Sequence, residues 1–387
     1  MNRKLKISYL IFFISILFVP LVINLIGITE KKQSSENRKL AECPEFDIKH
    51  LDPFPVKFEN FFNDHFPFRN TLLSYLFNVQ ARFFLRSPHP EKVILGSDEW
   101  MYSNNSDLNY VIGREYFTQG QTDTIINELK RRNDTCKKLG IDYRIIVVPS
   151  KPTIYPEYLP YYYSRSKNDP VTDLISKIKL NTGIHVLYLK DFLIQKKASN
   201  KLYYKHDTHW NETGTFFGYE AAASWLKITY SKIQPISRDY FTTKLNIKNS
   251  GNLAEQVGLE GFYVDETVGY IEKKKLPYMP RNKENYPVWS WFGYPWEYER
   301  AYQNVDTTLP RLMIIRDSYT NDLMQKLMAS HFGRTTVIWD YWQHKLNYHL
   351  IKAERPKVVI DIINELFLKN YALYPEKYSA KIDTSGL

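Results

Sequence analysis

The chain has 387 residues, of which 43% are hydrophobic and 24% are charged, the balance of a globular protein that buries a sizeable core. Its length allows two domains, or one core with a large insertion. The net charge of +10 is scattered along the chain without a zinc-finger or RNP-type motif, so we do not expect nucleic acid as a partner.

An uncharged apolar run from Ile7 to Ile28 follows a short basic leader. As a helix, this run would cross a bilayer core of roughly 30 Å. A cleaved signal peptide would have a shorter apolar region and a small-residue cleavage site, which the stretch from Gly27 to Glu30 matches poorly. We therefore predict that residues 1–28 form a single-pass signal anchor in the cytoplasmic membrane, with cleavage as the alternative. The body of the protein would then lie in the periplasm or outside the cell.

The region after the anchor contains a linker and a first turn signal. Residues 29–89 are predicted to form a polar stalk followed by a Phe-rich helical lead-in. Between Val93 and Tyr102, two apolar runs flank a Gly-Ser-Asp turn, which predicts a hairpin. Cys43 and Cys136 form no CxxC pair and so provide no metal or redox motif, and the sequence leaves open whether they are bridged.

Helix and strand patterns alternate from residue 120 onward, and residues 90–375 are predicted to form the main domain. Buried strands are predicted at residues 144–148, 185–189, 311–315, 334–339 and 357–363. Helices are predicted at residues 123–139, 171–180, 211–226, 320–330 and 343–354. Residues 228–305 interrupt the alternation and are predicted to be an irregular insertion rich in Tyr, Trp, Pro and Lys. This order predicts an α/β fold with a doubly wound parallel sheet, whose functional sites lie at the C-terminal ends of the strands.

Two short polar segments carry groups suited to nucleophilic catalysis. Ser318 follows the predicted strand at 311–315, where backbone N–H groups at a helix N-terminus can stabilise an oxyanion. Asp207 and His209 stand two residues apart on an extended loop, so a carboxylate can support an imidazole that acts as base. Together these residues form a candidate triad in the chain order Asp, His, Ser.

Other interpretations of the same residues are open at this point. Ser318 could be an ordinary helix N-cap, and Asp-x-His could belong to a polar loop ahead of a helix capped by Asn211. His206, Asp207 and His209 could also bind a metal ion, but the sequence offers no clear further ligand and no HExxH helix.

Several short elements, taken in order, carry a family resemblance. They are Gly96 to Tyr102, Val148 to Pro156, Asp207 to Asn211 with Gly214, Gly251 to Leu253, Arg316 to Tyr319, and Lys357 to Glu365. In this order they resemble the SGNH-hydrolase-like domain of the alginate O-acetylation proteins, the AlgJ/AlgX family, over residues 90–370. The resemblance implies an SGNH-type triad with Ser318 as nucleophile, His209 as base and Asp207 as orienter, and it implies no cofactor.

The resemblance also implies an activity and partners. It implies a bacterial O-acetyltransferase that passes an acetyl group through an acetyl-serine to polysaccharide hydroxyls outside the cytoplasm. A multi-spanning membrane O-acyltransferase would supply the acetyl groups. A carbohydrate acetylesterase with the same triad and a non-catalytic polysaccharide-binding or assembly protein are the alternatives.

Further residues are predicted near the substrate or the oxyanion. Asn252 replaces the acid of the family's Gly-Asp-Leu element and Arg316 the glycine of Gly-Asp-Ser, so both are expected in this vicinity together with Tyr319. Lys151 follows the first strand and either faces the substrate or is a solvated loop lysine. Aromatic residues of the insertion form either a sugar-stacking platform or a packed contact with the core: Trp289, Trp291, Tyr294, Trp296 and Tyr298.

Overall fold

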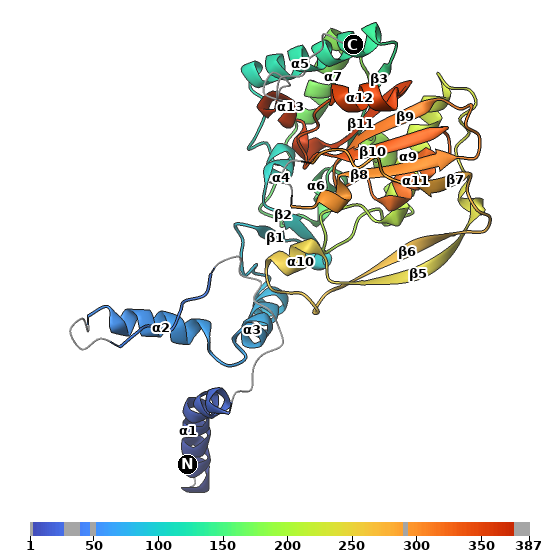
Figure 1. Cartoon of the computed structure of the whole chain (residues 1–387). Helices are drawn as coiled ribbons and strands as arrows, with labels where there is room; N and C mark the ends of the chain where they lie inside the picture. The colour runs from blue at the N-terminus through green and yellow to red at the C-terminus, as the bar shows by residue number, and fades with distance from the viewer. Residues whose placement is uncertain (1–2, 27–38, 47–51, 289–292, 375–387) are drawn as a thin grey trace.

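The computed structural model of the protein describes residues 3–26, 39–46, 52–288 and 293–374. A seven-stranded sheet of order β4-β3-β11-β9-β10-β8-β7 lies at its centre (Figure 1). Its strands are β3 (Asp142–Val148), β4 (His185–Tyr188), β7 (Tyr278–Arg281), β8 (Glu299–Asn304), β9 (Arg311–Arg316), β10 (Arg334–Trp339) and β11 (Val358–Asn364). The first five strands in this order are parallel, and β8 and β7 join antiparallel at the β10 edge.

The five predicted strands are confirmed, each within two residues at either end, and they are the five parallel ones. The sheet as a whole is mixed, because the insertion adds two antiparallel strands at one edge. The prediction of an α/β fold is therefore confirmed, and the prediction of a wholly parallel sheet is wrong.

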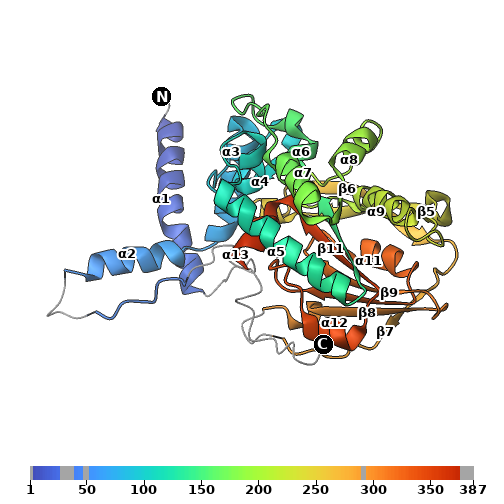
Figure 2. The ribbon, with the colours of Figure 1, turned by 90° about the horizontal axis from the view of Figure 1, so that it is seen from above.

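Alternating side chains of the strands build a core on each face of the sheet. Ile314 of β9 joins one buried cluster, and its neighbours Met313 and Ile315 join the other. The helices of the domain are α4 (Ser106–Val111), α5 (Gln119–Lys138), α6 (Lys151–Ile154), α7 (Pro170–Thr182), α8 (Lys190–Lys197), α9 (Glu212–Lys227), α10 (Asn252–Gln256), α11 (Asp322–Ala329), α12 (Tyr348–Glu354) and α13 (Asn370–Leu373). Figure 2 shows α5, α7 and α12 on one face and α9 and α11 on the other.

Two predictions about the C-terminal half are wrong. The helix predicted from residue 343 begins only at Tyr348, because residues 340–347 form a loop and Asn347 caps the N-terminus of α12. The insertion is not irregular. Besides β7 and β8, it contains a long antiparallel ribbon of β5 (Phe241–Asn249) and β6 (Val264–Glu272). The inward positions of β6 include Asp265 and Thr267, so the ribbon lacks the apolar alternation that announces a strand.

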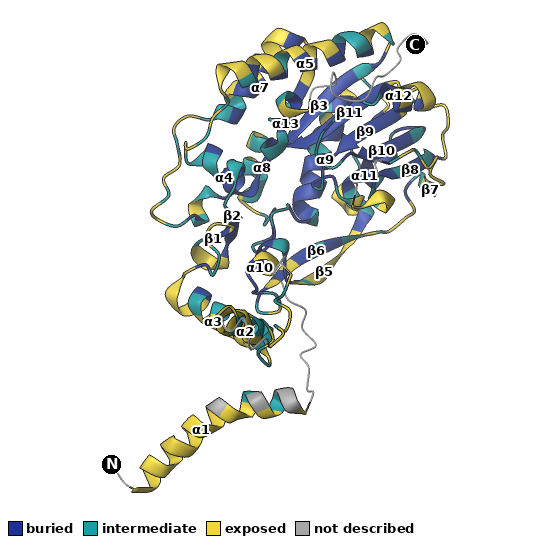
Figure 3. Cartoon of the chain, turned by 60° about the vertical axis from the view of Figure 1, so that its left-hand side comes forward, coloured by how far each residue is buried: buried dark blue, intermediate teal, exposed yellow. Residues whose placement is uncertain are grey.

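The N-terminal part consists of α1 (Arg3–Leu25), α2 (Phe54–Asp64) and α3 (Arg69–Phe84), and it is largely exposed in Figure 3. A search of the described residues finds no helix both long and apolar enough to pass through a bilayer. The predicted hairpin is confirmed as β1 (Val93–Leu95) and β2 (Met101–Ser103).

Candidate active site

The turn between β9 and α11 carries Ser318 at the C-terminal edge of the parallel strands. The N-cap of α11 is Asn321, whose side chain accepts from the Met324 amide, so the N-cap interpretation of Ser318 is wrong. The turn is fixed from beneath by Asp317, which is fully buried. One Asp317 carboxylate oxygen accepts from the Tyr319 amide at 2.8 Å, and the other accepts from the Asn364 amide at the end of β11.

The structure brings Ser318, His209 and Asp207 into one hydrogen-bonded chain. His209 Nε2 lies 2.9 Å from Ser318 Oγ, and His209 Nδ1 lies 2.7 Å from Asp207 Oδ1. The Asp207 side chain is 6% exposed and that of His209 is 28% exposed, so the carboxylate is sheltered and the imidazole is accessible. A hydroxyl, an imidazole and a carboxylate in this sequence can generate a serine nucleophile.

Asp207 is bound on both carboxylate oxygens. Oδ1 accepts from the backbone and ring of His209, and Oδ2 accepts from Lys248 Nζ at 2.7 Å and from the Asn252 amide at 3.2 Å. Burial alone would raise the pKa of Asp207, but the His209 hydrogen bond and the charges of His209 and Lys248 hold it well below the usual value. The carboxyl group is therefore ionised around neutral pH, as the candidate triad requires of it.

Lys151 lies beneath the loop that carries Asp207 and His209. Its ammonium group donates to the carbonyls of Tyr204, Lys205 and Asp207, at 3.2, 2.9 and 2.7 Å. The residue is 2% exposed, so both predictions for it, a substrate contact and a solvated loop lysine, are wrong. Burial lowers the pKa of Lys151 to about 7 against the opposing charges of Asp207 and Asp265.

Asp265 of β6 holds the same loop from the other side. Its carboxylate accepts from the amides of Lys205 and His206 at 2.7 and 3.0 Å, and it pairs with the Lys201 ammonium. The His206 ring is buried against Tyr263 and Asp265, whereas His209 faces Ser318. The residues of the alternative metal site therefore point to different neighbours. Among the residues that the structure describes, no group of three or more His, Cys, Asp and Glu side chains could hold a metal ion.

The remaining predicted residues near the oxyanion have defined contacts. Asn252 binds Thr208 twice, through its side-chain oxygen to the amide and through its side-chain nitrogen to the hydroxyl, each at 2.9 Å. Tyr319 donates its hydroxyl to the Thr208 carbonyl at 2.9 Å, and its ring lies 4.8 Å from that of His209. Arg316 is buried in an ion pair with Glu297. Asn252 and Tyr319 thus shape the site, and Arg316 lies under it.

The aromatic residues of the insertion divide between the two interpretations given for them. Tyr298 is buried in the core, as the packing interpretation expects, whereas Tyr294 and Trp296 are 45% and 62% exposed. Trp289 and Trp291 lie outside the described residues. Cys43 is exposed and Cys136 is buried, and neither is bonded to the other.

Sequence reasoning missed a charged cluster under the Ser318 turn. His344, fully buried in the loop after β10, lies 2.6 Å from Asp361 and 3.7 Å from Asp317. Burial alone would lower the pKa of His344, but the Asp361 and Asp317 carboxylates raise it to about 10. No local pattern announces this cluster, because its members come from three separate segments. Lys248 and Asp265 were missed for the same reason, since both lie on the unpredicted ribbon.

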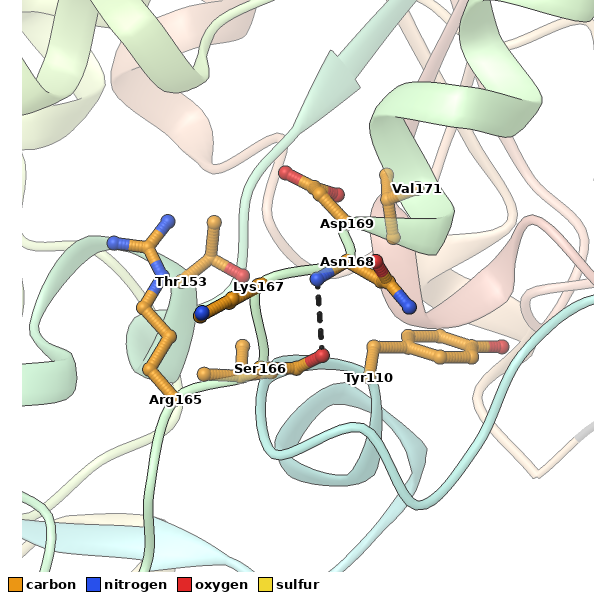
Figure 4. A pocket seen from close by; sticks show the side chains of 9 residues that line it. Tyr110, Thr153, Arg165, Ser166, Lys167, Asn168, Asp169 and Val171 are labelled. Carbon is orange, nitrogen blue, oxygen red and sulfur yellow. Dashed lines mark hydrogen bonds between the residues drawn. The ribbon is translucent and has the colours of Figure 1, made fainter.

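A cavity of about 190 Å³ lies elsewhere, between α4, α6 and the segment before α7 (Figure 4). It is lined by Tyr110, Val111, Thr153, Arg165, Ser166, Lys167, Asn168, Asp169 and Val171. None of these is a predicted site residue. We place the chemistry at Ser318 because a nucleophile requires a base in hydrogen-bond contact, not an enclosed volume.

Comparisons with known proteins bear on this arrangement. Residues 93–270 match the family model described as the SGNH hydrolase-like domain of acetyltransferase AlgX, a match that includes Asp207 and His209 and ends before Ser318. The probable alginate O-acetylase AlgJ of Pseudomonas putida is 25% identical over 166 residues, 43% of this chain and 40% of that protein. The protein of the same name in Pseudomonas syringae pv. tomato is 23% identical over 242 residues, 61% of this chain and 55% of that protein. The chain therefore spans only about half the length of these curated relatives.

A solved structure shows the same fold. Bacillus cereus PatB1 superposes with a TM-score of 0.54 at 15% sequence identity, over 71% of this chain and 96% of that one.

Proposed function

Residues 93–270 belong to the AlgJ/AlgX-like family of SGNH hydrolase-like domains, and on this premise we propose that the protein is a serine-dependent O-acetyltransferase acting on an extracytoplasmic polysaccharide. The observation that carries the proposal is the unbroken hydrogen-bonded chain from Ser318 Oγ through His209 to Asp207. This geometry provides a nucleophile, a base and an orienting carboxylate without rearrangement.

In the first half of the proposed reaction, His209 Nε2 takes the Ser318 proton while Oγ attacks the carbonyl carbon of an acetyl donor. The tetrahedral oxyanion collapses, the donor oxygen leaves with the proton held by His209, and acetyl-Ser318 remains. Asp207 accepts from Nδ1 and supports the imidazolium. The Tyr319 amide is engaged by Asp317, so we assign oxyanion stabilisation to the Ser318 amide itself.

In the second half, a sugar hydroxyl replaces the donor. His209 removes the proton of this hydroxyl as its oxygen attacks the acetyl carbon, and the proton then returns to Ser318 Oγ as the ester bond to the enzyme breaks. Water in place of the sugar would turn the same site into an acetylesterase. The acceptor must therefore be held against the acetyl-enzyme more effectively than water.

The test is mass spectrometry of the full chain after incubation with p-nitrophenyl acetate. We expect one added acetyl group, located on the peptide that contains Ser318 and absent from Ser318→Ala. Discharge of this adduct to an added glycan, with an acetylated glycan as product, identifies a transferase. Discharge at an unchanged rate into free acetate identifies the esterase. No adduct and no turnover would overturn the triad and favour a polysaccharide-binding or assembly protein.

We also propose that the N-terminal part attaches the protein to a membrane, where a multi-spanning O-acyltransferase supplies the acetyl groups. Two features support attachment. Described apolar side chains of α1, among them Leu10, Phe12 and Phe18, are exposed, and within the described residues α2 buries none of its own. The rings of Phe54, Phe58 and Phe62 follow one another along α2 at 5.7 and 6.4 Å. Flotation of the full chain with lipid vesicles tests this, and recovery of all the protein in the unbound fraction would contradict it.

A further inference from the structure

The loop that follows β10 has a strained backbone. Tyr341, Trp342 and His344 all have positive φ angles, of 59°, 65° and 50°. This region of backbone space is uncommon for residues other than glycine, and it is unfavourable for bulky side chains. Strain of this kind persists where the surrounding structure enforces it, and it is concentrated at functional sites.

Contacts from beneath enforce the conformation of this loop. The Asp340 carboxylate accepts from the His344 amide at 2.9 Å, and Asn370 donates to the Trp342 carbonyl at 2.5 Å. Nδ1 of the His344 ring lies 2.6 Å from the Asp361 carboxylate, and the backbone carbonyl of His344 accepts from Arg132. The loop is therefore anchored through buried polar contacts, and Trp342 also stacks on Phe367 at 6.0 Å, so the aromatic side chains of the loop are partly packed against the core.

The aromatic side chains of the loop pack next to those of the insertion. Tyr294 stacks on Trp339 and Tyr341, with ring centroids 5.8 and 6.4 Å apart and interplanar angles of 26° and 22°. Trp342 lies 4.3 Å from Tyr341, and Trp296 meets Tyr294 edge to face at 5.7 Å. Tyr294 and Trp296 are exposed, whereas Tyr341 and Trp342 are partly buried against the core, so the insertion residues present ring surface to solvent and the loop residues support them.

This surface lies beside the nucleophile. Trp339 is the register partner of Arg316 in the parallel pair β10 and β9, and the Arg316 guanidinium lies 5.1 Å from the centre of the Trp339 ring. Ser318 follows Arg316 by two residues, in the turn at the same edge of the sheet. Ligands of open α/β sheets bind at this edge.

We propose that Tyr294, Trp296, Tyr341 and Trp342 form the acceptor subsite, which stacks on the apolar face of a sugar ring and presents its hydroxyl to acetyl-Ser318. The inference rests on the proposed acetyl transfer and names the part of the site that selects a glycan over water. Pyranose rings combine a flat C–H face with a rim of hydroxyls, and Tyr and Trp combine a flat apolar face with a polar edge. The strain in the loop is explained because two of these rings are displayed from left-handed backbone positions.

The decisive variants are Tyr341→Gly and Trp296→Ala, with Tyr161→Ala as the matched control. Glycine adopts a φ of 59° without strain, so Tyr341→Gly removes a ring and relieves the backbone. Tyr161 is 96% exposed and is not part of the proposed aromatic subsite. Acetyl-Ser318 is formed in the full chain with p-nitrophenyl acetate, and its discharge is followed by mass against cellohexaose, chitohexaose and alginate oligosaccharides.

We expect at least one glycan to accelerate discharge in the wild type. Both subsite variants should raise the half-saturating glycan concentration about tenfold, whereas Tyr161→Ala should match the wild type. The thermal midpoint of Tyr341→Gly should stay close to that of the wild type, because relief of the backbone offsets the lost packing of a partly buried ring. An unchanged half-saturating concentration in both variants, or a lowered midpoint of Tyr341→Gly with unchanged glycan use, would overturn the subsite and make these rings structural.

Direct binding separates this inference from the proposed function. The glycans are titrated against Ser318→Ala by calorimetry, alone and combined with each subsite variant. Binding that the subsite variants weaken supports the subsite even where no acetyl-serine forms. Acetyl-serine formation without glycan binding would leave the proposed nucleophile standing and overturn the subsite.

Discussion

The two loops that meet at the candidate active site are built in different ways. The turn that carries Ser318 continues a parallel strand and is fixed by buried groups of the sheet itself, through Asp317 and the end of β11. The loop that carries Asp207 and His209 has little regular structure of its own. It is held by side chains that reach it from distant segments, chiefly Lys151 and Lys248. The proposed nucleophile thus depends on the fold of the sheet, and the proposed base depends on a few long-range charged contacts.

This difference implies that substitutions near the two loops have different effects on stability and activity. Substitutions around Ser318 should disturb the core, because the supporting groups are buried in it. Substitutions around His209 should divide into those that remove a buried support and those that remove an exposed one. Single substitutions of these supports test this division.

Asp207→Asn should lower the rate of Ser318 acetylation by roughly 10³- to 10⁴-fold. An amide in place of the carboxylate cannot accept the Nδ1 proton in the same way, so the imidazole is held in the wrong tautomer. Stopped-flow release of p-nitrophenolate measures the rate, and Asp173→Asn, an exposed helix position, is the control. A loss below about tenfold would show that Asp207 is not the orienting group.

Lys151→Met and Lys248→Met should differ sharply in their effect on stability, although each removes an ammonium group that supports the same loop. Lys151 is 2% exposed, and its loss leaves the buried carbonyls of Tyr204 and Asp207 without a donor, so we expect a loss of about 3–5 kcal/mol in the free energy of unfolding. The Lys248 side chain is 39% exposed, and its pairing with Asp207 is screened by water, so its loss should cost about 1 kcal/mol or less. Urea unfolding measures both. Equal losses would mean that burial does not separate the two supports.

Such contacts mark the limit of prediction from the sequence. The five parallel strands and the Ser318 turn follow from local patterns, because apolar runs and strand ends are properties of neighbouring residues. The Asp-x-His segment is also local, and the structure joins it to Ser318. The supports are not local. Lys248 and Asp265 lie on a ribbon without apolar alternation, and Lys151 resembles any loop lysine until the loop above it is placed.

The buried charges under the two loops should give opposite pH dependences of stability. The pKa of His344 is about 10 in the folded protein against an ordinary value of 6.5, so its contribution to stability is complete below pH 6.5 and is lost as the pH rises through 10. Lys151 has a pKa of about 7 in the folded protein against 10.5, so its cost is greatest below pH 7 and disappears as the pH rises towards 10.5. Between about pH 7 and pH 10, the contributions of His344 and Lys151 to the free energy of unfolding change with pH in opposite directions.

Removing one of these two groups should therefore reveal the pH dependence of stability that the other contributes. Relative to the wild type, the unfolding free energy of His344→Gln should rise with pH between 7.5 and 9.5 by about 1.4 kcal/mol per unit. That of Lys151→Met should fall by a similar amount. Urea titrations at four pH values across the window give both slopes. Slopes of the same sign in the two variants would contradict the assignment, and if one variant does not fold, the slope of the other decides.

The smallest effect is expected at Asn252, where the family's Gly-Asp-Leu element carries an acid. The contact from this residue to Asp207 is made by its backbone amide, which any side chain preserves. The Asn252 side-chain oxygen accepts from the Thr208 amide, and a carboxylate oxygen would accept in the same way. The second side-chain contact reverses readily, because the Thr208 hydroxyl can donate to a carboxylate where it now accepts from the amide nitrogen.

What Asn252→Asp adds is a negative charge near Asp207, and Lys248 is already placed to offset it. We therefore expect acetylation of Ser318 to slow by about threefold or less, an effect of well under 1 kcal/mol. The double variant Asn252→Asp with Lys248→Met should lose more than the two single variants together, since it leaves two carboxylates without their shared cation. Additive losses would show that Lys248 does not act as that cation. The base loop would then depend on its backbone contacts and on buried supports such as Lys151 and Asp265, and Lys248 on its exposed side would contribute nothing to the arrangement of the triad.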